Sequence, residues 1–217
     1  EEMFLPGKRF SNTIEYKTSK KEESFANTHF SGIQNHYRFI EQKGPLDIVG
    51  ISFHPAGLYP LVKIPVIEFR NHITSIDSII PGIETKIERV AEVDSISHKI
   101  SIIEESLMSI IDPGLLPGKN FDLLMNDFIG FADCINIKNF CKKNGVNQKS
   151  LERFFNKYIG TTPKAFANTT KLQKAIKLLH MRRFESLTEL GYELNYYDQT
   201  HFINSFKSFV GNMLYIC

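Results

Sequence analysis

Two groups of polar side chains in the C-terminal half have the types and spacing needed to hydrogen-bond base edges. An arginine can bind guanine through two donors, Gln and Asn can pair with adenine, and Glu can accept from the amino group of cytosine. One apolar member, Ile203, suits contact with a thymine methyl group. The pattern therefore predicts chemistry in the major groove of a duplex. The two groups are Gln148, Lys149, Glu152, Arg153 and Asn156, and Gln199, Thr200, Ile203, Asn204 and Lys207.

Each polar group lies on the outer side of a predicted short helix. Leu151 and Phe155 lie opposite the first group, and Phe202 and Phe206 opposite the second, because positions i and i+4 share a helix face. The same pattern recurs 51 positions apart, and each copy ends at a glycine, which readily takes the left-handed turn after a helix. A solvated helix face with no partner explains either group alone. The repetition favours two copies of one reading element.

The chain after residue 118 is predicted to be helical throughout. Asn147 is expected to cap the first repeated helix, and Pro163 to open a long central helix. This arrangement predicts two helix-turn-helix units, in which the second helix of each enters the groove. The expected helices lie near residues 121–132, 137–141, 148–158, 163–180, 186–194 and 198–209.

The predicted domain boundary is the segment 113–118, because it holds two Pro-Gly breaks. We expect a sensory or dimerisation domain over residues 1–112 and a DNA-binding domain over 119–217. The fold class is α+β, with a small mixed α+β domain followed by an all-α domain. The N-terminal elements expected are extended segments near 12–16, 36–40 and 46–53, a short helix near 86–92, and a helix over 97–111 with Ile100, Ile103, Leu107 and Ile111 inside.

The charge of the chain is unevenly distributed. Residues 119–217 contain 14 Lys and Arg against 8 Asp and Glu, while the rest contains 12 against 16. A basic C-terminal half can displace counterions from a duplex. The three cysteines, Cys134, Cys141 and Cys217, cannot form a disulfide framework. With no secretion signal and no membrane span in the sequence, we expect a reduced, cytoplasmic protein.

The sequence offers little for catalysis or metal binding. It has no nucleophile elbow, phosphate-binding loop, dinucleotide fingerprint or zinc-protease motif, so we predict that it is not an enzyme and needs no cofactor. The spacing of His54, Glu68 and His72 fits no standard ligand pattern. We expect His201 to be a packed structural histidine beside Phe202. Five aromatic residues are expected in the core rather than in a ligand cage, namely Tyr16, Tyr37, Phe53, Tyr59 and Phe69.

The C-terminal half resembles the AraC/XylS-type DNA-binding domain. The sequence 151–155, Leu-Glu-Arg-Phe-Phe, and the Ile-Gly-Thr-Thr-Pro of 159–163 resemble its first half. The sequences 186–190 and 196–202 resemble its second half. The resemblance implies a bacterial transcription regulator whose two units occupy successive major-groove segments on one face of the duplex. It places base-facing positions on Lys149, Glu152, Arg153, Gln199, Thr200, Ile203 and Asn204.

Four positions depart from the family pattern. Gly191 stands where alanine is usual, Asn195 where glycine is, and Leu214 where proline is. Lys171 replaces an arginine in the central helix, which keeps a charge for phosphate but loses bidentate contact. Residues 30–80 resemble the N-terminal domain of a less studied branch of the same family.

We therefore predict a sequence-specific DNA-binding transcription regulator. Its expected partners are double-stranded DNA, RNA polymerase, a small-molecule effector and a second copy of the chain, with no membrane. One alternative is a protein-interaction or small-molecule-binding protein whose helical half has lost specific DNA affinity. Another is an N-terminal domain that binds or converts a small molecule, with the helical half directing it to its target.

Overall fold

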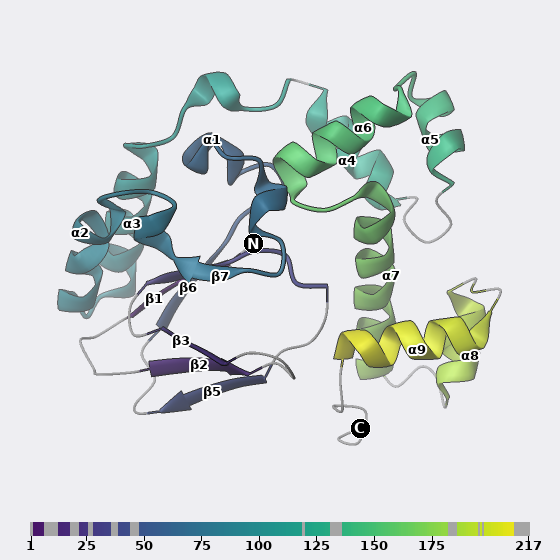
Figure 1. Ribbon diagram of the computed structural model, residues 1–217, viewed down its shortest axis with the longest axis horizontal. Helices are drawn as coiled ribbons and strands as arrows, with labels where there is room; N and C mark the ends of the chain where they lie inside the picture. Colours follow the sequence, from purple (N-terminus) through teal and green to yellow (C-terminus); the bar gives the residue numbers. More distant parts are fainter. Residues whose placement is uncertain are drawn as a thin grey trace. The chain divides into compact units, whose positions relative to one another are not determined.

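The computed structural model describes most of the 217 residues of the protein (Figure 1). Two compact units divide the chain. Unit 1 comprises Glu1–Gln34, Arg38–Leu116 and Lys157–Gly160, and unit 2 comprises Asn35–Tyr37, Pro117–Asn156 and Thr161–Cys217. Since each unit includes a short piece of the other half, the domain limits 1–112 and 119–217 stay a prediction. The described residues are 2–6, 13–17, 22–25, 28–35, 39–43, 48–118, 120–130, 136–181, 186–194, 196 and 198–210.

Unit 1 contains two antiparallel sheets. One has the strand order β6-β1-β4-β7 and the other β3-β2-β5. In the first sheet, Met3 faces both Phe30 and Ile51 across the ladder. The strands are β1 (Glu2–Pro6), β2 (Thr13–Lys17), β3 (Glu22–Phe25), β4 (His29–Ser31), β5 (Phe39–Lys43), β6 (Ile48–Ser52) and β7 (Ile73–Ser75). The predicted extended segments 12–16 and 46–53 coincide with β2 and β6, and the predicted segment 36–40 begins three residues before β5.

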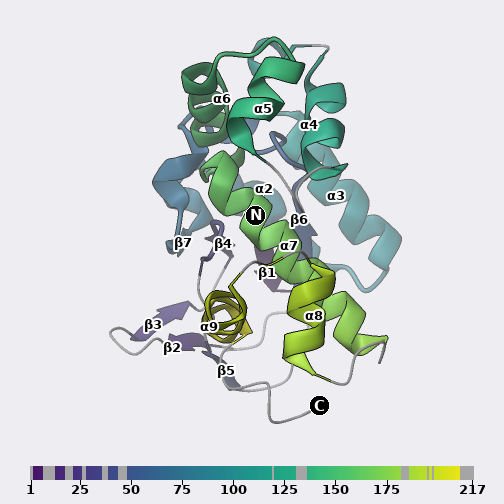
Figure 2. The same ribbon diagram turned by 90° about the vertical axis from the view of Figure 1, so that its right-hand side faces the viewer.

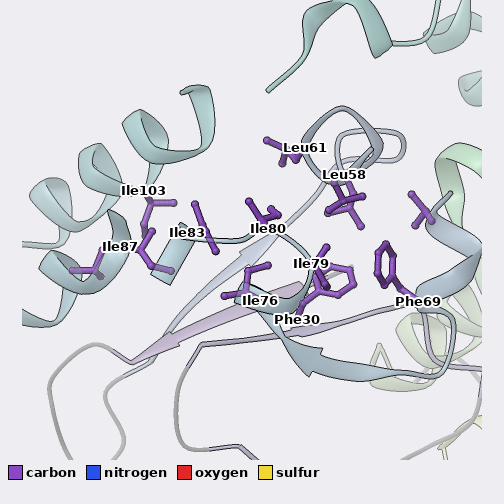
Figure 3. Close-up of a cluster of buried hydrophobic side chains, with 13 residues drawn as sticks. Phe30, Leu58, Leu61, Phe69, Ile76, Ile79, Ile80, Ile83, Ile87 and Ile103 are labelled. Atoms are coloured by element: carbon purple, nitrogen blue, oxygen red, sulfur yellow. The ribbon is translucent and has the colours of Figure 1, made fainter. Parts of the chain in front are cut away.

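Short helical segments and one longer helix form the core of unit 1 with the first sheet. Thirteen buried side chains make up this core, among them Phe30, Leu58, Ile76 and Ile83 (Figure 3). The rings of Phe30 and Phe69 meet edge-on, 5.4 Å apart between centroids. The α-helices are α1 (Tyr59–Val62), α2 (Ile83–Ile87) and α3 (Ile96–Met108), and the 3-10 segments are Val66–Phe69, Ile76–Ser78, Glu88–Glu92 and Pro113–Leu115.

Three of the four apolar residues predicted inside around helix α3 pack in or against the core, namely Ile103, Leu107 and Ile111, but the fourth does not. Ile103 is buried as expected, but Ile100 is 46% exposed, and Lys99 is only 4% exposed. Ser106 is buried on the same side as Lys99, and its hydroxyl donates to the carbonyl of Ile102 at 2.7 Å. The prediction that Ile100 lies inside is therefore wrong. A long lysine stem can fill apolar space as well as an isoleucine, so the apolar pattern alone does not fix the buried face.

Four residues from the C-terminal half, Lys157–Gly160, belong to unit 1. The ring of Tyr158 meets that of Tyr59 edge-on at 5.0 Å. The ammonium of Lys157 lies 4.5 Å from the centroid of the Tyr59 ring. These contacts explain why the four residues group with unit 1.

Unit 2 is helical in its described residues. Asn147 caps α6 as the sequence predicts, since its side chain accepts from the backbone N–H of Lys149 at 2.9 Å. The Ser186 side chain accepts from the backbone N–H of Glu189 at 3.1 Å in the same way. Pro163 opens the long helix α7, which ends at His180. The helices are α4 (Phe121–Gly130), α5 (Ile137–Lys143), α6 (Gln148–Phe154), α7 (Pro163–His180), α8 (Leu187–Glu193) and α9 (Gln199–Val210), with a π-helical turn at Phe155–Ile159.

Two aromatic-rich clusters lie at the two ends of α7. Near its start, the ring of Phe128 packs against Phe140 and Phe155 at 5.0 and 4.8 Å. Near its end, Leu172 and Ala175 pack with residues of α8 and α9, including Phe202 and Phe206. Helix α7 therefore separates two small helical packages within unit 2 (Figures 1 and 2). No helix in the described part of the chain is both long and apolar enough to span a bilayer.

Candidate nucleic-acid interface

Helices α5 and α6 form the first helix-turn-helix unit. Gly145 makes the turn between them with φ of 62°, in the left-handed region that favours glycine. The backbone N–H of Val146 then donates to the carbonyl of Cys141 at 2.9 Å, which satisfies the end of α5. Leu151 and Phe155 are fully buried, so the opposite side of α6 faces outward.

The outward face of α6 presents two exposed cations. Lys149 and Arg153 are both exposed, as the sequence predicts. Glu152 is half-buried and accepts a hydrogen bond from the Gln148 side-chain amide at 3.0 Å. This pair pre-orients two groups that can hydrogen-bond a base.

Asn156 does not join this face as predicted. It is half-buried, and its side-chain oxygen is buried without a hydrogen-bond partner among the described residues. The reason lies in the backbone, which changes from α-helix to a π-helical turn at Phe155. A π-helical turn contains more residues, so positions beyond it rotate away from the face extrapolated from α-helical spacing.

Helices α8 and α9 form the second helix-turn-helix unit. The Asp198 side chain accepts from the backbone N–H of His201 at 3.0 Å and so caps the start of α9. Leu190 and Phe202 are fully buried between the two helices. A Cβ on Gly191 would lie 3.1 Å from Cδ1 of the Phe202 ring, so the glycine permits this close approach of α9 to α8.

The outward face of α9 includes three of the predicted residues and one that was misassigned. Thr200, Asn204 and Lys207 are exposed. His201, expected to be packed, is exposed as well, because the next position, Phe202, takes the core site. Being next to a buried residue in sequence places a helical side chain about 100° away from it. Gln199 lies in the first turn of α9, and its side chain lies outside the described residues.

Ile203 is half-buried and packs against the second cluster of unit 2. The expectation of an exposed apolar side chain is therefore wrong. Contact between Ile203 and a thymine methyl group stays a prediction, which concerns the part of its side chain that is not buried. Its counterpart 51 residues earlier, Glu152, is half-buried too. The next positions, Arg153 and Asn204, are both exposed. The sequence repeat is thus a structural repeat. In each copy the first of these two positions is half-buried and the second is exposed.

Lys171 does not extend freely into solvent as a phosphate ligand would. It is half-buried on α7, and its ammonium lies 4.0 Å from the centroid of the Tyr196 ring. Only the family resemblance places Lys171 among the DNA contacts. Lys171 and Tyr196 are 25 positions apart in the chain, and a contact between such distant residues has no sequence signature.

The titratable groups near the first unit include one shifted thiol. Burial raises the pKa of the Cys141 thiol above its ordinary value, and the charge of Glu152 raises it further. Cys134 and Cys217 lie outside the described residues. His54, Glu68 and His72 are all exposed, and the described residues hold no group of three or more potential ligands able to bind a metal.

Two family models match separate parts of the chain. Residues 140–214 match a model described as "Helix-turn-helix domain". Residues 7–75 match one described as "Domain of unknown function (DUF6597)". No curated protein sequence matches the chain.

Among solved structures, the chain is similar to two crystal structures of ToxT from Vibrio cholerae, one of them an apo variant. Each is 11% identical with a TM-score of 0.47, and each comparison covers 99% of this chain. The share of the ToxT chain covered is 88% for the apo variant and 87% for the other.

Proposed function

We propose that this chain is a DNA-binding transcription regulator of the AraC type, and that it reads two successive major-groove segments of one duplex with α6 and α9. The match of residues 140–214 to a helix-turn-helix domain supports the DNA-binding role. The observation that carries this proposal is the structural repeat. Arg153 and Asn204 are exposed at equivalent positions, while Leu151 and Phe202 are buried at equivalent positions. A repeated element with matched buried and exposed faces is what two equivalent groove contacts require.

The central helix supports the spacing of the two contacts. Helix α7 has 18 residues, which at 1.5 Å each makes it about 27 Å long. Helix α6 lies at one end of α7 and α9 at the other in both views (Figures 1 and 2). Successive major-groove segments on one duplex face are about 34 Å apart. The helix length is therefore of the right order for α6 and α9 to enter neighbouring turns.

The chemistry of the two faces differs. The face of α6 offers the cations Lys149 and Arg153, which suit guanine O6 and N7. The face of α9 offers Asn204 and Thr200, which suit adenine and mixed contacts, with Lys207 close to the phosphates. We therefore expect a guanine-containing block under α6 and an adenine-containing block under α9.

The N-terminal unit is proposed to control this activity by binding a small-molecule effector, a second copy of the chain, or both. RNA polymerase is the further partner expected of a regulator of this type. We propose that the protein acts in the bacterial cytoplasm without catalysis of its own. The match to a domain of unknown function identifies no effector.

Selection of bound duplexes from a random pool tests the proposal. We expect two enriched blocks whose centres lie about 10 base pairs apart, one for each unit. The Asn204→Ala variant should relax the base preference at one position of one block, and Arg153→Ala at one position of the other. Enrichment of a single block, or of none, would contradict reading by two helices.

A further inference from the structure

A cation–ring contact lies at the second helix-turn-helix unit. The ammonium of Lys171, on α7, lies 4.0 Å from the centroid of the Tyr196 ring, in the turn between α8 and α9. Both side chains are half-buried. A cation over an aromatic face is attracted by the negative charge of that face, more strongly where water is partly excluded. The contact therefore ties the central helix to the turn.

Tyr196 is in turn connected to the recognition helix. Its ring lies 4.7 Å from that of Phe202, between centroids, and its backbone N–H donates to the carbonyl of Gly191 at 2.9 Å. Phe202 is fully buried and lies 5.6 Å from Phe206, also on α9. A continuous set of contacts thus runs from Lys171 through Tyr196 to the buried side of α9.

The turns of the two helix-turn-helix units differ in length. Four residues separate α5 from α6, whereas five separate α8 from α9. Val146 in the first turn and Tyr196 in the second make the same type of backbone hydrogen bond, to the residue five positions earlier. The second turn therefore has one more residue between that bond and the start of the recognition helix. The added residue gives α9 more freedom to tilt unless a further contact restrains it.

We propose that Lys171 is a positioning residue that sets the orientation of α9 through Tyr196, and that it is not a phosphate contact. The proposal rests on the proposed function, since orientation matters only if α9 reads DNA. Its ammonium already interacts with the ring, so moving it to a phosphate would break the contact that holds the turn. The expected consequence of losing Lys171 is poorer base discrimination in the segment read by α9, and in that segment alone.

The test compares Lys171→Met with Lys177→Met in the full chain. Methionine keeps much of the apolar stem and removes the charge, and Lys177 is an exposed lysine of the same helix. Binding is measured over a range of salt concentrations on the selected duplex, on mismatched duplexes and on a random duplex. For Lys171→Met we expect a loss of about threefold to tenfold on the selected duplex, no change on the random one, and an unchanged salt slope. A slope smaller by about 0.9 with equal losses on both duplexes is the signature of a phosphate contact and overturns the proposal.

Variants of the ring separate positioning from simple loss of stability. Tyr196→Phe keeps an aromatic face and should retain discrimination, and Lys171→Arg should as well, because arginine also stacks on rings. Tyr196→Leu should lose discrimination as Lys171→Met does. Combining Tyr196→Leu with Lys171→Met should add little, because both break the same contact. Full additivity of the two losses would contradict the proposal.

A measurement on the free protein keeps this proposal distinct from the proposed function. Aromatic ring currents should shift the Lys171 side-chain methylene protons upfield in the NMR spectrum, and Tyr196→Leu should abolish the shift. If the shift is present but no duplex is selected, the contact exists but the proposed function is wrong. The role of Lys171 in reading DNA is then wrong as well. If duplexes are selected but the shift is absent, the positioning role is wrong.

Discussion

Arg153 and Asn204 show how a repeat in sequence becomes a repeated surface. Each follows a half-buried residue and each lies on the side of its helix opposite a fully buried pair. Arginine has donors in a fixed fork, so its contact with guanine depends on which base is present, whereas a lysine contact with phosphate does not. The two kinds of contact therefore respond differently to substitution.

We expect Arg153→Ala to weaken binding to the selected duplex by about 1–3 kcal/mol and to relax preference at one base position. Lys207→Ala is the matched comparison, because Lys207 is also exposed and cationic but is expected to contact phosphate. It should weaken binding to all duplexes by a similar factor. Fluorescence anisotropy on selected, mutated and random duplexes measures both. Equal losses on every duplex for Arg153→Ala would remove its role in base recognition.

Cys141 should be an unreactive thiol in the folded protein. It is buried, and burial raises its pKa, so less of it is thiolate at a given pH than of an ordinary cysteine. A folded-state pKa above the unfolded value stabilises the fold below the unfolded pKa, and this contribution is lost as pH rises through the folded pKa. With Cys134 and Cys217 replaced by serine, a thiol reagent at pH 8 should modify Cys141 slowly and at the rate of unfolding. Fast modification of the native protein would show that the thiol is accessible.

At the level of elements, the sequence predicts a helix well wherever its signals are local. Asn147 and Ser186 cap their helices, and Pro163 opens α7 at the expected residue. Local signals fail where a distant contact decides the outcome. Lys99 takes a core position that spacing assigns to Ile100, and Lys171 lies on the ring of Tyr196. β1, β4 and β7 pair with strands far along the chain and were missed for that reason, while β3 was missed although it pairs with its neighbour β2.

The same reasoning explains which residues were assigned to the correct face of their helix. Arg153, Lys149 and Asn204 lie on regular α-helix, where a spacing of 3.6 residues per turn assigns their side correctly. Asn156 lies beyond the change to a π-helical turn, which nothing in the local sequence indicates. His201 was assigned from its neighbour rather than from its own position on the helix.

Gly191 is expected to resist replacement by alanine although it lies inside a helix. Alanine would favour the helix by about 1 kcal/mol. Its Cβ, however, would lie 3.1 Å from the ring of Phe202, which is fully buried and has little room to move. Overpacking of this kind costs about 1–3 kcal/mol, so we expect a net loss of about 1 kcal/mol in the free energy of unfolding.

Gly130→Ala is the matched control for this substitution. Gly130 is the last residue of α4, and a Cβ there would have no neighbour within 4 Å. Gly130→Ala should leave the free energy of unfolding unchanged or raise it. Urea unfolding followed by circular dichroism measures both variants. An increase in stability for Gly191→Ala equal to that for Gly130→Ala would show that α8 and α9 can separate without cost.

For the molecule as a whole, the uneven charge and the two units agree with the proposal that one part binds DNA and the other controls that binding. The C-terminal part has the cationic excess, while unit 1 has the sheets and an apolar core of its own. Exposed cations contribute to binding chiefly by displacing condensed counterions from the duplex, and each contact adds about 0.9 to the slope of affinity against salt on logarithmic axes. A surface that binds another protein does not release condensed counterions in this way.

A salt titration of the full chain on random duplex therefore tests the function at this scale. If Lys149, Arg153 and Lys207, all exposed, each approach a phosphate on non-selected DNA, the slope should be about −3 or steeper. Lys207→Gln, at the lysine assigned to phosphate, should reduce the slope by about 0.9 without changing base preference. A nearly flat slope, with the protein folded by circular dichroism, would exclude phosphate binding and favour a helical half that binds a protein partner instead. A steep slope without selectivity would retain DNA binding but remove the reading role of α6 and α9.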